Sequence, residues 1–318
     1  MENNFIVSVN PHVYGKRNTT GVMLDVIIAL LPAVVASVVL FGARAAMVIG
    51  VCVVSCVIFE YLFTLICKRP VSVGDLSAVV TGILLALNIP STIPLWQAVV
   101  GSFIAIVVVK CLFGGIGRNF ANPAITARVV MLIAFTGTMT DIVFPVQKVD
   151  TVATATPLSA LPMGGVEAVD ASLLDMFLGV RGGALGETSA AALLLGFVYL
   201  LVRGIITWHT PVVFIGTVFL GSLAITGDVT TALYYTLSGG LFIGAIFMAT
   251  DYVTTPITTA GRVIFAIGCG LITVVIRNFA NIPEGVSFSI LIMNILTPLI
   301  DRYVKPRPFG VKKEASGK

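Results

Sequence analysis

The stretch RNFAN, at residues 118–122, occurs a second time at residues 277–281 of this 318-residue chain. GILLALNIPSTIP, residues 82–94, precedes the first copy, and GAIFMATDYVTTP, residues 244–256, precedes the second. Each of these segments has a proline twelve residues after its opening glycine, and an apolar segment then leads to RNFAN. We therefore interpret the chain as two related halves.

The composition is typical of a membrane protein. The chain is 57% hydrophobic and 11% charged, and its mean hydropathy is +1.05, whereas soluble domains carry about 25% charged residues. Residues 1–20 are polar and lack the apolar core and cleavage site of a signal peptide, so we expect a retained cytoplasmic tail. The net charge of +4 is too small to suggest a nucleic-acid partner.

Ten apolar segments are candidates for membrane spans, which need about 17 to 25 residues each. The sequence therefore predicts an all-α, polytopic membrane protein with five spans in each half. The expected spans are 21–42, 45–67, 76–90, 96–113, 124–137, 188–207, 210–227, 235–250, 261–276 and 286–304.

The segment 138–187 between the two sets of spans is long and acidic, and it is not a span. Cytoplasmic loops collect Lys and Arg, and placing the amino terminus inside leaves only Arg44 and Arg277 in the short outer loops. The inner side then receives Lys16, Arg17, Lys68, Arg69, Arg118, Arg203, Arg262, Arg302, Lys305, Arg307, Lys312, Lys313 and Lys318. We therefore expect an extracytoplasmic loop at 138–187 and a basic cytoplasmic tail at 305–318.

An odd number of spans in each half means that the second half crosses the bilayer in the opposite direction to the first. The halves, 21–137 and 188–304, are therefore predicted to be inverted repeats, a plan similar to that of urea transporters. Irregular backbone at membrane depth must be buried in protein or line a cavity. The Pro- and Thr-rich segments that precede each RNFAN copy thus predict a pocket where the halves meet.

Four charged residues lie deep within the expected spans: Asp25, Glu60, Lys110 and Arg128. Charges in such positions are costly and face the protein interior or a water-filled path. Two interpretations are open. Asp25 and Glu60 take part in coupling to a cation, or they pair with the two basic residues as a structural network.

The outer loop contains VDTVATATPLSALP at residues 149–162, a run of small and hydroxyl-bearing residues. It resembles the flavin-attachment motif shared by the D subunit of the Rnf complex and the B subunit of the sodium-pumping quinone reductase. The positions that match are Asp150, Ala155, the acceptor Thr156, Pro157 and Leu158. Ala153 and Thr154 replace the Ser and Gly of that motif, so Thr154 is a second nearby hydroxyl.

The resemblance extends over nearly the whole chain, including the amino-terminal stretch 10–33 and GGIGRNFANPA at 114–124. It implies a multi-pass subunit of a bacterial inner-membrane complex that moves electrons between reduced ferredoxin and NAD while translocating Na⁺ or H⁺. It also implies FMN joined through its phosphate to Thr156 by a flavin transferase, and other Rnf subunits as partners. Because the chain has no soluble catalytic domain, we expect it to be inactive alone.

Relatives in this family hold a second, non-covalent flavin, such as riboflavin, within the membrane. The candidates for lining such a site are Arg118, Asn119, Phe120 and Asn122. The alternative role for these residues is helix capping and loop anchoring. A different class of function also fits the layout, namely a small-solute channel of urea-transporter-like fold that binds no flavin.

Overall fold

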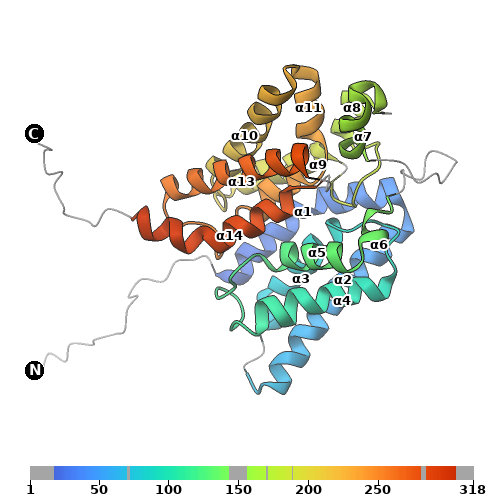
Figure 1. The fold of residues 1–318 in the computed structure, drawn as a ribbon. Helices are drawn as coiled ribbons and strands as arrows, with labels where there is room; N and C mark the ends of the chain where they lie inside the picture. Colours follow the sequence, from blue (N-terminus) through green and yellow to red (C-terminus); the bar gives the residue numbers. More distant parts are fainter. Residues whose placement is uncertain are drawn as a thin grey trace, which may run out of the picture.

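The computed structural model describes residues 18–69, 72–142, 156–169, 171–187, 189–280 and 284–305. These residues form helices joined by loops, without a β-strand among them. In Figure 1 the helices of the first half (blue to green) gather on one side and those of the second half (yellow to red) on the other. The structure thus confirms the all-α class.

The helices of the first half are α1 (Thr19–Phe41), α2 (Ala43–Ile66), the 3₁₀-helix η1 (Val73–Asp75), α3 (Ser77–Leu87), α4 (Leu95–Phe103) with its π-helical continuation η2 (Ile104–Cys111), α5 (Pro123–Ala134) and α6 (Thr136–Thr140). The connecting region holds α7 (Pro157–Gly164), the 3₁₀-helix η3 (Gly165–Ala168) and α8 (Leu173–Leu178). The second half has α9 (Ala190–Val202), α10 (His209–Thr226), α11 (Val229–Leu237), α12 (Leu241–Ile243), the π-helix η4 (Gly244–Met248), α13 (Thr259–Phe279) and α14 (Val286–Tyr303).

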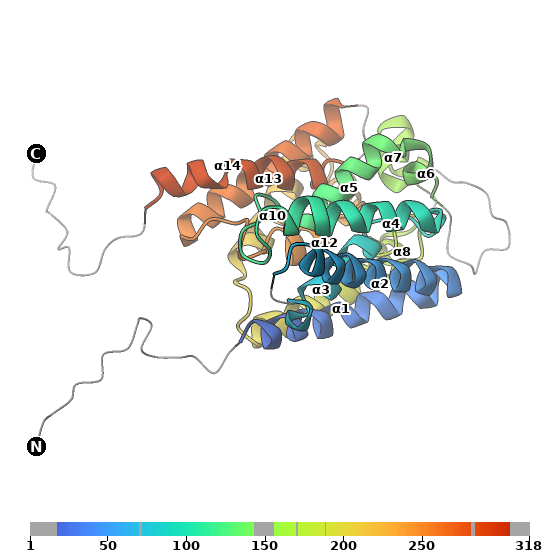
Figure 2. The same ribbon diagram turned by 90° about the horizontal axis from the view of Figure 1, so that it is seen from below.

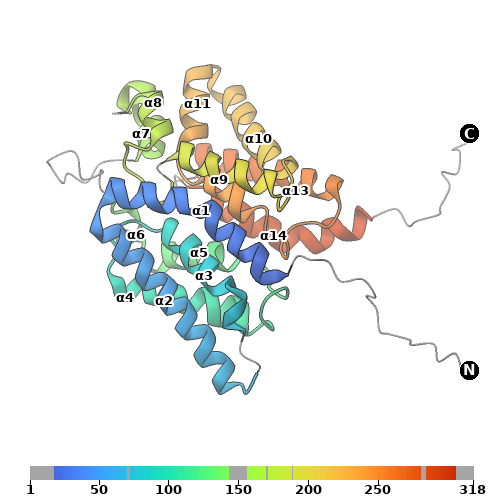
Figure 3. The same ribbon diagram turned by 180° about the vertical axis from the view of Figure 1, so that it is seen from behind.

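Both halves pack their helices in the same order. In the first half α2 contacts α3 and α4, and α5 contacts η2; in the second half α10 contacts α11 and α13, and α14 contacts α13. The halves meet where α1 lies along α9 and α5 lies along α14, as Figures 2 and 3 show from two further directions. The two halves thus have the same order of helix contacts.

Each expected span corresponds to a helix or a broken helix, but their lengths differ. Among the described residues, α1, α2, α10, α13 and α14 are long and apolar enough to cross a membrane. The helices at α3, α4–η2, α5 and α9 are shorter than a full span. Short helices that meet inside a protein need less length, because their ends are covered by neighbouring chain instead of lipid.

The span expected at 235–250 is wrong as a single helix. Its helical residues begin earlier, at Val229, and the chain breaks at residues 238–240 before continuing to Met248 with a bend of 65°. Gly239 has a φ of +65°, which a glycine adopts without strain and which ends α11. The predicted loop 138–187 also contains helical structure, because α7 and α8 lie within it.

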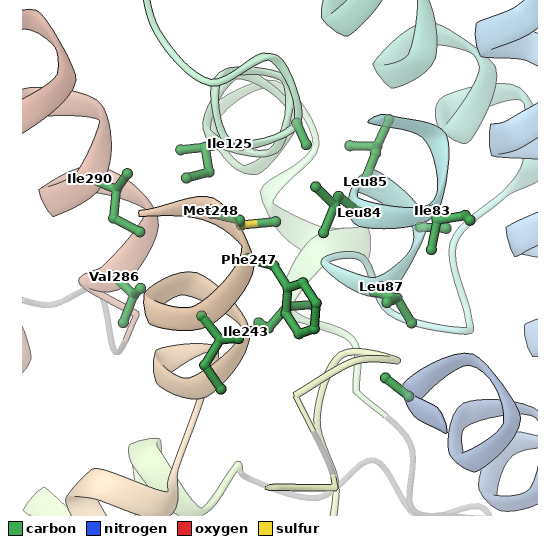
Figure 4. Close-up of a cluster of buried hydrophobic side chains, with 14 of the residues drawn as sticks. Ile83, Leu84, Leu85, Leu87, Ile125, Ile243, Phe247, Met248, Val286 and Ile290 are labelled. Atoms are coloured by element: carbon green, nitrogen blue, oxygen red, sulfur yellow. The ribbon is translucent and has the colours of Figure 1, made fainter. Parts of the chain in front are cut away.

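The core includes the place where the end of α3 faces η4. Leu84, Leu85 and Leu87 of α3 approach Phe247 and Met248 of η4, and all five are buried (Figure 4). This apolar contact holds the end of α3 and the end of η4 together. The irregular segment after α3 and the irregular segment before α12 therefore both adjoin this core.

Candidate functional site

A cavity of about 480 Å³ lies between the two halves and the connecting region. Its wall includes Arg128 of α5, Thr156 and Leu158 at the start of α7, the segment 181–187, and Glu284 just before α14. Ligand sites in proteins have volumes of about 300–1,000 Å³ and are mostly apolar with a few polar groups. The cavity has this size and character, and Asn88 and Pro90 of the segment 82–94 line it, but no residue of the segment 244–256 does.

Thr156 is the N-cap of α7. Its Oγ1 accepts a hydrogen bond from the Ser159 amide at 3.1 Å and lies 3.0 Å from Ser159 Oγ. Helix N-termini favour negatively charged groups, because the first amides and the helix dipole point toward them. A phosphoester on this oxygen would therefore lie in a favourable field.

Leu158 anchors the helix that Thr156 begins. Its side chain is buried in a cluster with Leu161, Met176, Tyr234 and Tyr235, which joins α7 and α8 to α11 of the second half. This packing fixes the position of Thr156 at the cavity wall. Asp150 and Ala155, the other predicted residues of the attachment motif, lie outside the described residues.

Arg128 connects three separate parts of the chain at the bottom of the site. Its Nη1 donates to Asn88 Oδ1 at 2.6 Å, and its Nη2 donates to Glu187 Oε1 at 2.5 Å and also to Glu284 Oε2. Asn88 directly follows α3. The guanidinium of Arg128 therefore links the segment after α3 to the connecting region and to the second half. Arg128 is 5% exposed, which makes these bonds stronger than the same contacts in water.

The break in the second half reaches the same point. A β-carbon on Gly240 would lie 3.1 Å from Glu187 Oε1 and 3.3 Å from both Arg128 Nη1 and Glu284 Oε1. These separations are tight, so a side chain at this position would require the neighbouring groups to shift by a few tenths of an ångström. The bend between α11 and α12 therefore lies beside the ion pairs of Arg128, and Gly239 of the bend forms part of the cavity wall.

Two further arginines are buried near this cluster of ion pairs, and Arg181 is the one that lines the cavity. Arg181 donates to the carbonyl oxygen of Glu187 at 2.6 Å, and Arg277 donates to the carbonyl oxygens of Tyr235 and Ser238 at 2.6 and 3.0 Å. Burial lowers the pKa of Arg181 to about 10, so this residue stays positively charged at neutral pH. The sequence placed Arg277 in an outer loop, but the structure places it in the last turn of α13, where it is buried.

The carboxyl group of Glu284 has a pKa well above its usual range. Burial raises the pKa of its carboxyl to about 7, although Arg128 favours the ionised form, and the neighbouring carboxyl of Glu187 adds to the rise. The site thus combines fixed positive charge with a carboxyl group that titrates near neutrality.

The first RNFAN copy lies at a different, smaller cavity of about 110 Å³, and only Asn119 and Asn122 of the four predicted residues line it. Phe120 packs against Phe113, with ring centroids 4.8 Å apart, and is 43% exposed. Arg118 is exposed. Asn122 caps α5, where its Oδ1 accepts from the amides of Ala124 and Ile125 at 3.0 and 3.3 Å.

The capping role of Asn122 predicts a defined cost for its removal. We expect Asn122→Ala to lower the free energy of unfolding by about 1 kcal/mol through the lost cap. Asn122→Ser keeps an acceptor and should recover most of this loss. Thermal unfolding of the purified variants measures both, and equal stability of Asn122→Ala and the wild type would contradict the capping role.

Comparison with known proteins identifies the group to which the chain is related. A family model described as the NQR2, RnfD, RnfE family matches residues 6–310. The chain belongs to this family.

Three relatives illustrate the similarity within the NQR2, RnfD, RnfE family, and each is the D subunit of its complex. The chain is 46% identical to that of the Na(+)-translocating ferredoxin:NAD(+) oxidoreductase complex of Acetobacterium woodii, and the alignment covers 99% of each chain. It is 40% identical to that of the proton-translocating ferredoxin:NAD(+) oxidoreductase complex of Clostridium ljungdahlii, over 98% of each. It is also 40% identical to that of the ion-translocating oxidoreductase complex of Stutzerimonas stutzeri, over 95% of each.

In this member of the NQR2, RnfD, RnfE family, both deep acids are paired. Glu60 accepts from Lys110 Nζ at 2.8 Å through both of its oxygens, and Lys110 also donates to Ser77 Oγ at 2.6 Å. Asp25 pairs with Arg203 at 3.0 Å and accepts from Tyr199 Oη at 2.9 Å. The predicted network is thus present for Glu60, whereas Arg128 has other partners than those expected.

The buried pair of Glu60 and Lys110 predicts that removal of the lysine strongly lowers stability and that a second substitution restores part of it. Lys110→Met leaves Glu60 buried without a counter-charge and should cost about 3–5 kcal/mol of unfolding free energy. Adding Glu60→Gln removes the unpaired charge and should recover a large part of that loss. Thermal unfolding of both single variants and the double variant tests this.

The same double variant separates the two roles considered for Glu60. If the pair is purely structural, the stable double variant should support ion translocation within the assembled complex. Loss of translocation in a stable double variant would instead assign Glu60 to cation coupling.

Sequence reasoning missed four members of the larger site: Asn88, Arg181, Glu187 and Glu284. A signal was present, because Arg128 lies within an expected span and required an acidic partner. Glu284, in NIPEG directly after the second RNFAN copy, was a candidate for that partner. Glu187 was counted only as one acid of the outer loop.

Proposed function

We propose that this chain is the D-type membrane component of an Rnf complex and that it carries FMN covalently bound to Thr156. In this account it relays electrons within an assembly that couples electron transfer between ferredoxin and NAD⁺ to the translocation of Na⁺ or H⁺. The names of the Acetobacterium and Clostridium relatives support the assembly. Those names differ in the ion, so either ion is compatible with family membership.

The single observation that carries the flavin proposal is the position of Thr156. This residue matches the acceptor of the attachment motif, and its hydroxyl lies at the wall of a cavity of about 480 Å³. The cavity offers apolar wall from Leu132 and Phe288, and the guanidinium groups of Arg128 and Arg181 beside the carboxyl groups of Glu187 and Glu284. These features fit a flat aromatic ring with a polar edge.

Each residue of the site would have a separate role in holding the flavin. Thr156 Oγ1 would hold the phosphate at the N-terminus of α7, and Leu158 would keep that helix against α11. Arg128 and Arg181 would orient the polar edge of the ring. The isoalloxazine ring itself supplies the one- and two-electron chemistry, as flavins do in all such proteins.

The ten expected segments would place this site on the extracytoplasmic side of the bacterial inner membrane. Both termini would then be cytoplasmic, and the two halves would be inverted repeats. The packing order shared by the halves and the distribution of Lys and Arg support this topology. Other Rnf subunits would be the partners, and a flavin transferase would attach the FMN.

No second flavin is proposed at the first RNFAN copy. The cavity at Asn119 and Asn122 has about 110 Å³, which is below the range of ordinary cofactor sites. The capping bonds of Asn122 account for its buried position.

A denaturing gel gives the first test of the proposed function. The band of this chain, purified with its complex, should fluoresce under ultraviolet light, and its intact mass should exceed that of the polypeptide by one FMN less one water. A small-solute channel of the same fold would give a non-fluorescent band with the mass of the bare chain.

A further inference from the structure

Two carboxyl groups meet one cation at the bottom of the large cavity. Glu187 and Glu284 both accept from the same nitrogen, Nη2 of Arg128. Because both carboxyl groups lie within hydrogen-bond distance of one nitrogen, they also lie close to each other. Two carboxylates that share one site repel each other, and one shared proton removes that repulsion.

The other charged groups around the pair are engaged elsewhere. Arg277 of α13 directs both terminal nitrogens to backbone carbonyl oxygens of α11 and the break that follows it. Arg181 donates to the backbone of Glu187, not to its carboxylate. Tyr235 of α11 is the remaining titratable neighbour of Arg277. Among the described residues, Arg128 is therefore the cation that directly bonds the two carboxyl groups.

The pair has access to the cavity. Arg128, Glu187 and Glu284 all line it, and the side chain of Glu284 is 16% exposed against 9% for Glu187. A water molecule in the cavity can therefore reach the carboxyl group of Glu284.

We propose that Glu187 and Glu284 form a proton-binding site in which the two carboxyl groups share one proton beside Arg128. A hydronium ion from the solvent transfers its proton to a carboxylate oxygen of Glu284 and leaves as water, and the resulting O–H donates to Glu187. Arg128 keeps its charge, and the net charge of the three side chains changes from −1 to 0. This site goes beyond the proposed function, because it depends on the geometry of the cluster and requires no flavin.

The electrostatics of Glu284 agree with this geometry. Its pKa is raised to about 7 by burial, whereas the usual value for glutamate is about 4.3. The folded protein therefore binds the proton more tightly than the unfolded chain. By linkage, this group's contribution to stability is fully present at low pH and decreases as pH rises through neutrality.

Infrared difference spectroscopy of the purified complex in lipid tests the proposal. Spectra recorded across pH 7 should contain the carbonyl stretch of a protonated carboxylic acid that disappears as the pH rises through about 7. The band should shift in D₂O. It should be absent in Glu284→Gln, and its titration should be displaced or lost in Glu187→Gln, because each variant removes one partner of the shared proton.

Glu60→Gln is the matched control, because Glu60 is also a buried glutamate but forms its ion pair with Lys110 alone. This variant should retain the band. The proposal is overturned if the wild type has no carboxylic acid band near neutral pH, or if the band survives in Glu284→Gln and is lost in Glu60→Gln.

Thermal unfolding provides a second measurement that does not depend on band assignment. The midpoint of the wild type should fall as pH rises through about 7, and Glu284→Gln should reduce that dependence. Identical pH dependence in the wild type and a folded Glu284→Gln protein would contradict the shared proton. If Glu284→Gln does not fold, the wild-type infrared titration decides alone.

Discussion

Thr156→Val is expected to abolish the covalent flavin, so that the fluorescent band disappears and the intact mass falls to that of the bare polypeptide. The reason is chemical, because valine has nearly the shape of threonine but no hydroxyl to carry the phosphoester. The lost N-cap bond to Ser159 should cost only about 1 kcal/mol, so the protein should still assemble. Intact mass spectrometry of the chain, together with gel fluorescence, measures the effect.

Two control variants give this prediction its specificity. Thr154→Val removes the second hydroxyl of the motif and should leave the flavin in place. Thr156→Ser keeps both the hydroxyl and the helix cap and should restore attachment. Loss of the flavin in Thr154→Val, with retention in Thr156→Val, would show that Thr154 is the acceptor.

Arg128→Met should produce the largest loss of stability, about 3–5 kcal/mol of unfolding free energy or more. It leaves the buried carboxyls of Glu187 and Glu284 without their cation and Asn88 Oδ1 without its donor. Arg128→Lys should lose less, because an ammonium group can bond some of these acceptors but lacks the planar fork of the guanidinium. Thermal unfolding of the purified variants measures these differences.

The control for Arg128 is an arginine outside the cluster. Arg302 of α14 is exposed, and Arg302→Met should change stability by no more than about 0.5 kcal/mol. Adding Glu284→Gln to Arg128→Met should recover part of the lost stability, because one uncompensated carboxylate is then removed. Equal stability of Arg128→Met and Arg302→Met would contradict the bridging role of Arg128.

Hydropathy predicted the helical segments well, because lipid and core both select apolar residues over the length of a helix. The break at residues 238–240 could not be predicted in the same way. LSGGLF contains no proline, and two glycines in an apolar stretch are equally compatible with a packed helix. The reason for the break is tertiary, since Gly240 must leave room for side chains of α5 and the connecting region.

The ion pairs also differ in how far apart their partners lie along the chain. The pairing of Glu60 with Lys110 belongs to one of the two open interpretations of the deep charges, and the structure contains this pair. The same interpretation pairs Arg128 within the first half, but its carboxyl partners lie 59 and 156 residues further along the chain. Charge counts within a half cannot reveal a partner that the other half supplies across the seam.

The candidate site was predicted from a motif and not from a fold. Thr156 and Leu158 followed from the resemblance of residues 149–162 to an attachment motif, and the structure places both at the cavity wall. The residues opposite them come from α5, the segment 181–187 and the start of α14. Their assembly depends on how the halves pack, and no local pattern encodes that packing.

A map of the purified complex tests the central claim most directly, because it locates the ring itself. The account predicts an isoalloxazine ring in the cavity between Arg128, Leu158 and Glu284, connected through a phosphate to Oγ1 of Thr156. An unmodified Thr156 with lipid filling the cavity, or a ring attached to another residue and lying elsewhere, would contradict it.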